Sequence, residues 1–306
     1  MSLTLRFLGT AASRPTVERN VSAIALVREG ETLLFDCGEG TQRQMMRYGI
    51  SFILGDIFFT HFHADHVLGV IGLIRTMQLQ ARTESLRLWG PAGIMKFLQQ
   101  ASSFTGERLP FLVIPGEVTP GTPIPRQGYS IIPFAASHRG SPAVGYTLAE
   151  DLRLGRFHPE MARARGIPEG PLWGELHRGR IVTLHDGSTV DPAELVGPHR
   201  PGRRVVITGD TRPCDSTIEA ARDADLLVHE ATFAEEEATR AVETGHSTAR
   251  EAAMVAQQAN VRQLILTHVS ARYSRDTSDL DREATAVFPN SLVARDGMEI
   301  EVPFRD

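Results

Sequence analysis

The chain has 306 residues, of which 42% are hydrophobic and 23% are charged, and its formal net charge at pH 7 is −5. This composition excludes a disordered or low-complexity chain. No apolar run reaches the roughly 18 residues that a membrane-spanning helix needs, so no membrane association is expected. The negative net charge argues mildly against a nucleic-acid partner, although it averages over the surface and can hide a basic patch.

Two features of the sequence predict a cytoplasmic protein. The chain begins with an alternating strand pattern, MSLTLRFLGT, and lacks the basic and then apolar pattern of a secretory signal. Its two cysteines, Cys37 and Cys214, form no local pair motif, which fits a reducing compartment better than a disulfide framework.

The first part of the chain is rich in predicted strands. Apolar and β-branched residues indicate strands at 3–8, 21–27 and 32–36. The loop at 13–20 carries two arginines, and its residues alone favour a solvated turn. Asp36 ends the third strand, before two glycines and a predicted helix at 41–48. Asp36 is predicted either to cap this helix or to orient a metal-ligating histidine.

The next segment, HFHADH at 61–66, predicts a metal site. It lies between the apolar run DIFFT and a helical pattern, so three histidines and an aspartate converge at a strand-to-helix turn. A solvated polar loop would explain one histidine but hardly this cluster, and nitrogen with oxygen ligands suits zinc or a similar ion. The i, i+2 spacing of His61 and His63 favours one ion there and leaves Asp65 and His66 for a second. Paired ions are a recurring device for phosphoester hydrolysis.

Further polar residues lie at strand ends or helix starts later in the chain. They are His138, Asp210, Glu230, His246 and His268. An open α/β architecture brings such positions to its active edge. A lone His138 would be a weak candidate, but the incomplete metal site upstream makes it a predicted ligand.

The segment 152–180 differs in amino-acid composition from the rest of the chain. It contains six arginines against three glutamates, few apolar residues, and a Gly-Pro interruption at Gly170-Pro171. This composition predicts an excursion from the sheet core. The residues leave two functions equally open: a solvated surface insert, or an arm that grips a polyanion.

Several motifs together make the chain resemble the ribonuclease Z family of the metallo-β-lactamase superfamily. They are DCGEGTQ at 36–42, HFHADH at 61–66, HEAT at 229–232, HST at 246–248, and Gly170-Pro171. HFHADH alone resembles the whole superfamily, whereas HEAT, HST and the arm narrow the resemblance to this family. The resemblance implies an α/β fold, a four-layer αββα sandwich forming a single domain at 1–306, with a protruding flexible arm inserted at about 152–180.

The resemblance also implies two zinc ions per subunit, held by seven side chains. Three histidines would hold one ion, two histidines and an aspartate would hold the other, and a further aspartate would bridge them. In that order the residues are His61, His63 and His138; His66, His268 and Asp65; and Asp210.

The implied reaction is hydrolysis of an RNA phosphodiester by a water activated between the two ions. Asp65 would accept the proton of this water. His246, oriented by Glu230, would donate a proton to the leaving 3′ oxygen or stabilise it. From the residues alone, Glu230 could equally be a salt-bridge partner and His246 a neighbour of a helix N-cap.

The substrate that the resemblance implies is precursor tRNA, which would lose its 3′ trailer and keep a 3′-hydroxyl. A homodimer is implied as well, in which the arm of one subunit helps to hold tRNA for the other. The expected substrate-binding residues are Arg19, Arg163, Arg165, Gly170, Pro171 and Arg178. Arg19 belongs to a loop that resembles the family segment Pro-x-Lys-x-Arg-Asn, with Val17 in place of the lysine.

Two other functions compete with this interpretation. A sister hydrolase of small phosphodiesters or sulfate esters would use the same metal site, but a small substrate needs no distant basic arm. A catalytically silent RNA-binding relative would keep only the scaffold, but the complete ligand set argues against it.

Overall fold

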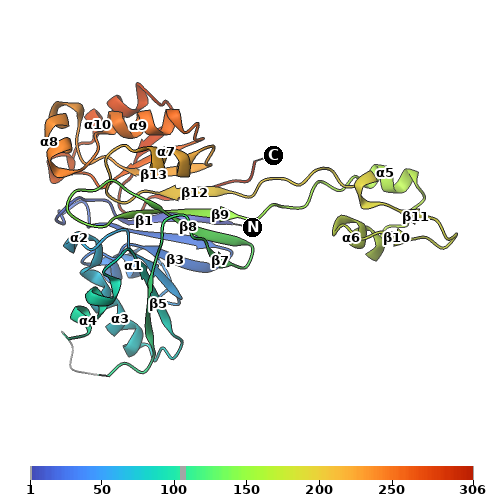
Figure 1. Ribbon diagram of the computed structural model, residues 1–306, viewed down its shortest axis with the longest axis horizontal. Coiled ribbons are helices and arrows are strands. Elements are labelled where there is room, and N and C mark those ends of the chain that lie inside the picture. The colour runs from blue at the N-terminus through green and yellow to red at the C-terminus, as the bar shows by residue number, and fades with distance from the viewer. Residues whose placement is uncertain (1, 104–107, 306) are drawn as a thin grey trace.

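The computed structural model describes residues 2–103 and 108–305. Within this part of the chain, two β-sheets of seven strands each pack face to face, and helices cover the outer face of both (Figure 1). This architecture is the predicted four-layer αββα sandwich. Across the same residues, no helix combines the length and the apolar character needed to cross a membrane.

The first sheet is built mainly from the N-terminal part of the chain. Its strands in spatial order are β16 (Glu299–Glu301), β1 (Leu3–Gly9), β2 (Ala23–Arg28), β3 (Glu31–Phe35), β4 (Asp56–Phe58), β5 (Leu86–Gly90) and β6 (Val113–Glu117). The strands β3 to β6 run parallel. The outer face carries α1 (Thr41–Arg47), α3 (Gly69–Leu79) and α4 (Ile94–Ser103), whose apolar side chains form one cluster with the sheet.

The second sheet is built from the C-terminal part. Its strands in spatial order are β15 (Ser291–Val293), β14 (Leu264–Thr267), β13 (Leu226–Glu230), β12 (Arg204–Ile207), β9 (Val144–Glu150), β8 (Tyr129–Ala135) and β7 (Ile124–Arg126). The parallel strands β12 to β15 are short apolar runs because both of their faces are covered. The covering helices include α7 (Asp215–Ala221), α9 (Ala249–Gln258) and α10 (Ser278–Thr285).

The two sheets meet in an apolar core rich in aromatic rings. The ring of Phe58 stacks on Phe35 with centroids 5.2 Å apart and meets Tyr146 of the second sheet edge-on at 5.4 Å. The Tyr146 hydroxyl donates a hydrogen bond to the Phe59 carbonyl at 2.7 Å, so its buried polar atom is satisfied. These contacts fix the ends of β4 and β9, which carry the site, relative to each other.

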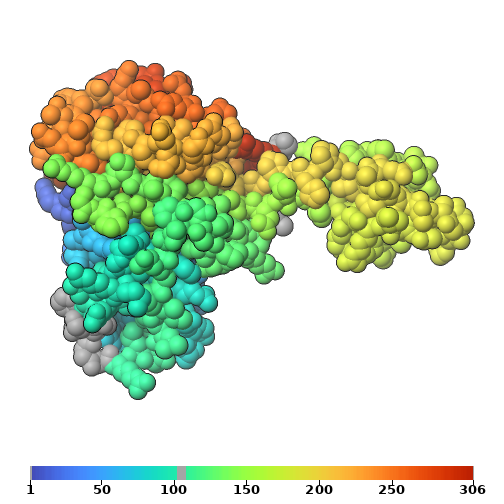
Figure 2. Space-filling view, viewed as in Figure 1, coloured from blue at the N-terminus to red at the C-terminus, as the bar shows by residue number. Residues whose placement is uncertain are grey.

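The arm leaves the sandwich between β9 and β12 and projects well beyond it (Figures 1 and 2). It contains α5 (Pro159–Ala164), α6 (Pro171–His177), the short strands β10 (Val182–Thr183) and β11 (Thr189–Val190), and the 3₁₀ turn η1 (Pro192–Glu194). Its two connecting segments pair through an antiparallel bridge between Arg153 and Arg200. The arm is therefore one continuous excursion that starts and ends at the same place on the sheet.

The arm extends past the expected range of 152–180 and returns to the body only at Arg200. The residues after Arg180 fold back as the β10–β11 hairpin, and their apolar side chains complete a small core inside the arm. The buried members of this core are Ala162, Ile167, Leu176, Val182, Val190 and Leu195. The hairpin has strands of only two residues, which are too short to give a periodic pattern in the sequence.

Candidate active site

The predicted ligands gather at one edge of the sandwich, where parallel strands of both sheets end. The segment 61–66 follows β4 and includes the short helix α2 (Ala64–Val67). From the second sheet, Asp210 follows β12, Glu230 ends β13, and His268 follows β14. His138 comes from the β8–β9 connection. Residues up to about 200 positions apart in sequence therefore meet here, for example Asp65 and His268.

Two glycines let the turn after β3 pack directly against the metal-site loop. A Cβ atom at Gly38 would lie 2.2 Å from the carbonyl oxygen of Asp65, and one at Gly69 would lie 2.0 Å from the carbonyl oxygen of Gly38. Any larger residue at either position would push these segments apart. The DCGEGTQ motif therefore supports the loop that carries the ligands.

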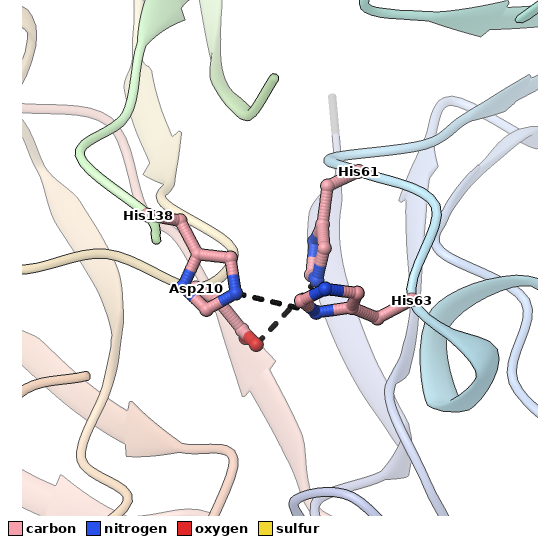
Figure 3. Close-up of side chains that lie close together, drawn as sticks. All are labelled: His61, His63, His138 and Asp210. Atoms are coloured by element: carbon pink, nitrogen blue, oxygen red, sulfur yellow. Dashed lines mark hydrogen bonds and ion pairs between the residues drawn. The ribbon is translucent and has the colours of Figure 1, made fainter. Parts of the chain in front are cut away.

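One group of possible ligands consists of His61, His63, His138 and Asp210, whose ligand atoms all lie within 4.8 Å of one another. Figure 3 shows their side chains pointing toward a common centre from three separate segments. His138 Nε2 lies 3.2 Å from His63 Nδ1, and His61 Nε2 lies 3.6 Å from Asp210 Oδ2. His61 and Asp210 are buried while His63 is exposed, so this group opens to solvent on one side.

A second group consists of Asp65, His66 and His268, again with ligand atoms within 4.8 Å. His66 Nε2 and His268 Nε2 lie 3.3 Å apart, and each also lies 3.3 Å from Asp210 Oδ1. The two oxygens of Asp210 therefore face different groups, because Oδ2 is directed to His61. This arrangement places Asp210 between the two groups, as the resemblance implies.

Asp36 orients two of the ligand histidines. His66 Nδ1 donates to Asp36 Oδ2 at 2.7 Å. The hydroxyl of Thr60 donates to the same carboxylate, so His61 Nδ1 is the donor in its 3.1 Å contact with the Thr60 oxygen. Both Nδ1 atoms thus carry their protons, and Nε2 is the atom that each ring directs toward the centre. Asp36 makes no cap for α1, whose N-cap is Gly40.

The centre fits divalent metal ions. His61 Nε2 and Asp210 Oδ1 are buried without a hydrogen-bond partner in the described residues, which would cost about 1–3 kcal/mol each in a metal-free protein. Burial and the neighbouring His66 lower the pKa of His61 well below its usual value, so its imidazole is neutral and free to act as a ligand. Two pairs of imidazole nitrogens also face each other at 3.2–3.3 Å, a spacing that either a shared proton or a metal ion between them can satisfy.

His246 and Glu230 form a hydrogen-bonded pair beside this centre. His246 Nδ1 donates to Glu230 Oε1 at 2.9 Å. The buried Glu230 also accepts bonds from the backbone amides of Thr211 and Ser247, at 2.8 and 3.0 Å. Burial alone would lower the pKa of His246, but the charge and hydrogen bond of Glu230 outweigh it and raise this pKa to about 9. His246 is therefore a protonated imidazole at neutral pH. Its Nδ1 is the atom that binds Glu230, and its Nε2 does not.

The backbone before α9 holds His246 in place, and His246 is not itself the helix cap. Thr248 is the N-cap of α9 and forms a capping box with Glu251. Arg212 donates to the His246 carbonyl at 2.6 Å and pairs with Glu251 at 2.5 Å. These contacts involve the backbone carbonyl of His246 and not its imidazole.

Arg19 was expected to contact substrate, but the structure buries it. Its side chain donates to Thr10 Oγ1 at 2.8 Å and to the Ala294 carbonyl at 2.6 Å, and only 7% of the residue is exposed. The guanidinium therefore anchors the loop at 13–20 to the body of the protein. In the amino-acid sequence nothing distinguishes this arginine from an arginine on the surface, since its partners lie in other segments of the chain.

The expected substrate-binding residues of the arm lie on or beside α5 and α6, which project away from the sandwich in Figure 1. Gly170, with a φ of 146°, is the N-cap of α6, and Pro171 is its first residue. The arginines are exposed but paired with glutamates inside the arm. These pairs are Arg163 with Glu169, Arg165 with Glu194, and Arg178 with Glu175.

Sequence reasoning missed three polar groups of the site. The Thr60 hydroxyl forms hydrogen bonds with both Asp36 and His61. The Thr232 hydroxyl likewise links Glu230 and His268 Nδ1, through hydrogen bonds of 2.7 and 3.0 Å respectively. The Ser13 amide donates to Asp65 Oδ2 at 2.7 Å. Thr60 directly precedes HFHADH and Thr232 is the last residue of HEAT, and a hydroxyl within or next to such a motif is the signal that could have found them. Nothing local in the sequence marks Ser13.

Comparisons with known proteins agree with this geometry. The profile of the Beta-lactamase superfamily domain matches residues 195–269, and that of Anti-Pycsar protein Apyc1 matches residues 3–105. A protein named Ribonuclease Z from Gemmatimonas aurantiaca is 63% identical over 99% of this chain and 96% of its own length. Another from Myxococcus xanthus is 50% identical over 99% of both chains.

The structure is also similar to a solved structure with substantial sequence identity. The crystal structure of human tRNase Z, short form, superposes with a TM-score of 0.72 at 26% identity. The match covers 98% of this chain and 100% of the human chain. The similarity thus spans nearly the whole chain, both sheets included.

Proposed function

The chain belongs to the ribonuclease Z family, and we propose that this tRNA 3′-processing endoribonuclease removes the 3′ trailer of precursor tRNA with two zinc ions per subunit. The single observation that carries the proposal is the convergence of seven ligand side chains on one edge of the sandwich. The product tRNA would keep its 3′-hydroxyl, since the bond that breaks joins phosphorus to the 3′ oxygen.

Three histidines and a shared aspartate would hold one zinc ion, and the remaining three ligands would hold the other. These sets are His61, His63, His138 and Asp210, and Asp65, His66, His268 and Asp210. Imidazole nitrogen with carboxylate oxygen is a donor set that suits zinc. When bound, the two ions would lower the pKa of a water and neutralise charge on the phosphoryl oxygens.

Asp65 would take the proton from the attacking water. Burial raises its pKa, but a hydrogen bond from His268 and the charges of His66 and His268 outweigh burial and lower it, so the carboxylate is ionised at neutral pH. The Ser13 amide holds one oxygen of this carboxylate, which fixes its orientation. A general base needs both an accepting charge state and a fixed position.

His246 would protonate the leaving 3′ oxygen. Its Nδ1 is bound to Glu230, so Nε2 is the atom that can carry the proton to the substrate. Glu230 in turn is held by backbone amides and by Thr232, so the pair has one geometry. The raised pKa of His246, about 9, keeps it protonated at neutral pH.

The arm would bind tRNA away from the chemistry. The whole chain carries a net charge of −5, so RNA binding needs a local surface that presents arginines and backbone amides. The arm projects from the body and exposes Arg163, Arg165 and Arg178. Each is paired with a glutamate in the free protein, and exposed pairs of this kind exchange partners at little cost because they contribute about 0–1 kcal/mol.

We also propose that the protein forms a homodimer in the cytoplasm. An apolar groove of about 640 Å3 between α3 and α4 supports a second copy as partner; Met95 in its lining is 61% exposed, and Leu79, the last residue of α3, is 87% exposed. Exposed apolar surface of this kind marks association sites. Sedimentation of the wild type and of a Leu79→Glu, Met95→Glu variant tests the dimer; an unchanged dimer in the variant would contradict this face.

The function is tested by cleaving a 5′-labelled precursor tRNA with zinc-loaded protein and mapping the new end. The expected product ends with a 3′-hydroxyl at the junction with the trailer. A chromogenic phosphodiester serves as the small substrate, and His63→Ala as the inactive control. Cleavage of the small substrate alone would instead indicate a sister hydrolase, and cleavage of neither a silent RNA-binding protein.

A further inference from the structure

A pocket of about 480 Å3 lies beside His246 and contains none of the seven metal ligands. Three segments line it: the loop after β1, the region from β13 through α8 (Ala238–Thr244), and the 3₁₀ turn η3 (Ala271–Tyr273). Its basic side chains are Arg14, Arg240 and Arg272, one from each segment. Three guanidinium groups from separate parts of the chain thus share one hollow next to the proposed proton donor.

The charge of this pocket is largely uncompensated. No Asp or Glu is among its described lining residues, and none of the described carboxylates forms an ion pair with Arg14 or Arg240. Arg272 has a loose partner, because its Nε lies 3.6 Å from Glu237 Oε1. Arg163, Arg165 and Arg178 of the arm, by contrast, each contact a glutamate. An uncompensated group of exposed guanidinium groups in a protein of net charge −5 fits an anionic ligand.

The pocket wall is fixed by packing. Phe233 is buried, with its ring centroid 6.3 Å from that of His246 and 5.9 Å from the guanidinium carbon of Arg240. The aromatic ring therefore sets the spacing between the imidazole and this arginine. A phosphate on Arg240 would have a defined position relative to the proton donor.

The position of His246 indicates which side of the cleaved bond in the RNA the pocket faces. Its Nδ1 is bound to Glu230, so the leaving oxygen must approach Nε2. That oxygen belongs to the 3′ carbon of the last nucleotide on the tRNA side of the cleaved bond. The chain that continues from this nucleotide toward the tRNA body is the part of the substrate next to His246.

From this geometry we propose that Arg14, Arg240 and Arg272 bind the RNA phosphate that lies one position 5′ to the cleaved bond. This inference rests on the proposed function and extends it by assigning the tRNA side of the substrate to one wall of the site. The trailer leaves on the other side. A phosphate held here positions the leaving 3′ oxygen at His246, and a small phosphodiester has no group to fill the pocket.

The test is a cycle of protein variants and modified substrates. Precursor RNAs carry one neutral methylphosphonate linkage, placed either one position 5′ or one position 3′ to the cleaved bond. They are cleaved by wild type, by an Arg14→Gln, Arg240→Gln variant, and by Arg222→Gln. Arg222 is an exposed arginine just after α7, outside the pocket, and serves as the matched control. Zinc content and far-UV circular dichroism check that each variant folds.

With the wild type, the neutral 5′ linkage should lower kcat/KM by about 10- to 100-fold, the range for charge-assisted hydrogen bonds to a phosphate. In the double variant the same linkage should lower kcat/KM by less than about threefold, because two of its three proposed partners are already gone. Arg222→Gln should behave as wild type.

Losses that simply multiply would overturn the proposal, because independent effects mean no contact. Coupling at the 3′ linkage would overturn it as well, since the pocket would then hold the trailer. A wild type that cleaves no precursor would refute the proposed function itself, and that result is distinct from both.

Discussion

The metal-site edge and the arm differ in how their residues are brought together. The edge assembles residues from both sheets, most of them buried, and hydrogen bonds to Asp36 and Glu230 fix the orientation of neighbouring histidines. The arm is one continuous segment with a core of its own, and its charged side chains form exposed pairs. Chemistry requires fixed positions, which only the packed sandwich supplies, whereas binding of a large anion requires reach. The two tasks are therefore separable, and variants in one region should leave the task of the other intact.

The largest effect is expected from His63→Ala. The group that holds His63 would keep two histidines and the shared Asp210, a weaker zinc site. Turnover on both precursor tRNA and a small phosphodiester should fall by more than about 10³-fold, because metal assistance is worth several kcal/mol. Metal analysis should show the loss of one equivalent with unchanged circular dichroism. Full metal content and normal activity would refute the ligand assignment.

The next effect is expected from His246→Ala, which should lower turnover by about 10²–10⁴ at unchanged metal content, the range for loss of a general acid. Glu230→Gln should cost less. The double variant should be little worse than His246→Ala, because the 2.9 Å pair acts as a unit. Single-turnover rates decide the matter, and losses that multiply would contradict the coupling.

The pH dependence of turnover should sharpen the role of Glu230. His246 must be protonated to donate, and its pKa is raised to about 9, so turnover should decline as the pH rises through this value. Glu230→Gln removes the charge that raises this pKa, and the decline should move to lower pH. The same shift has a consequence for stability: the pair stabilises the fold below the ordinary pKa of histidine, and this contribution is lost as the pH rises through about 9. A decline at the same pH in the variant would show that another group controls it.

A smaller effect, confined to the arm, is expected from Trp173→Ala. The Trp173 ring packs on Phe157 at 5.3 Å and its Nε1 donates to the Ile167 carbonyl at 3.2 Å. Because the side chain is only partly buried, the arm should lose about 2–3 kcal/mol of local stability, below the 3–5 kcal/mol of a fully buried aromatic residue. Hydrogen exchange should accelerate within residues 157–196 and stay unchanged in the sandwich. Faster exchange throughout the protein would show that the two regions fold as one.

The sandwich was predicted from short motifs that resemble a known family, and the gathering of the polar residues at one edge was predicted from their places at strand ends. A histidine directly after an apolar strand is visible in the chain, and the ends of parallel strands meet at one edge, so His61, Asp210 and His268 could be placed together. The roles of Thr60 and Ser13 could not be predicted, since their function is a hydrogen bond to a residue in another segment. The burial of Arg19 was missed for the same reason.

The arm shows the same limit. Its existence was predicted from composition, but not its extent, because the closing hairpin has strands of two residues each. Its length is defined by the bridge between Arg153 and Arg200, a long-range contact that leaves no local pattern in the sequence. Local pattern thus located both regions, and long-range contacts determined what each side chain does.

Excision of the arm tests the separation of chemistry and binding most directly. A short Gly-Ser turn replaces residues 154–199 and joins the paired positions Arg153 and Arg200. Hydrolysis of a small chromogenic phosphodiester should persist, because all seven ligands lie outside the excised segment. Cleavage of precursor tRNA should be abolished, and the salt dependence of tRNA binding should flatten by roughly 0.7–0.9 in log–log slope for each lost phosphate contact. Retained tRNA affinity and cleavage would contradict this separation and would show that the arm is a surface insert without a role in tRNA binding.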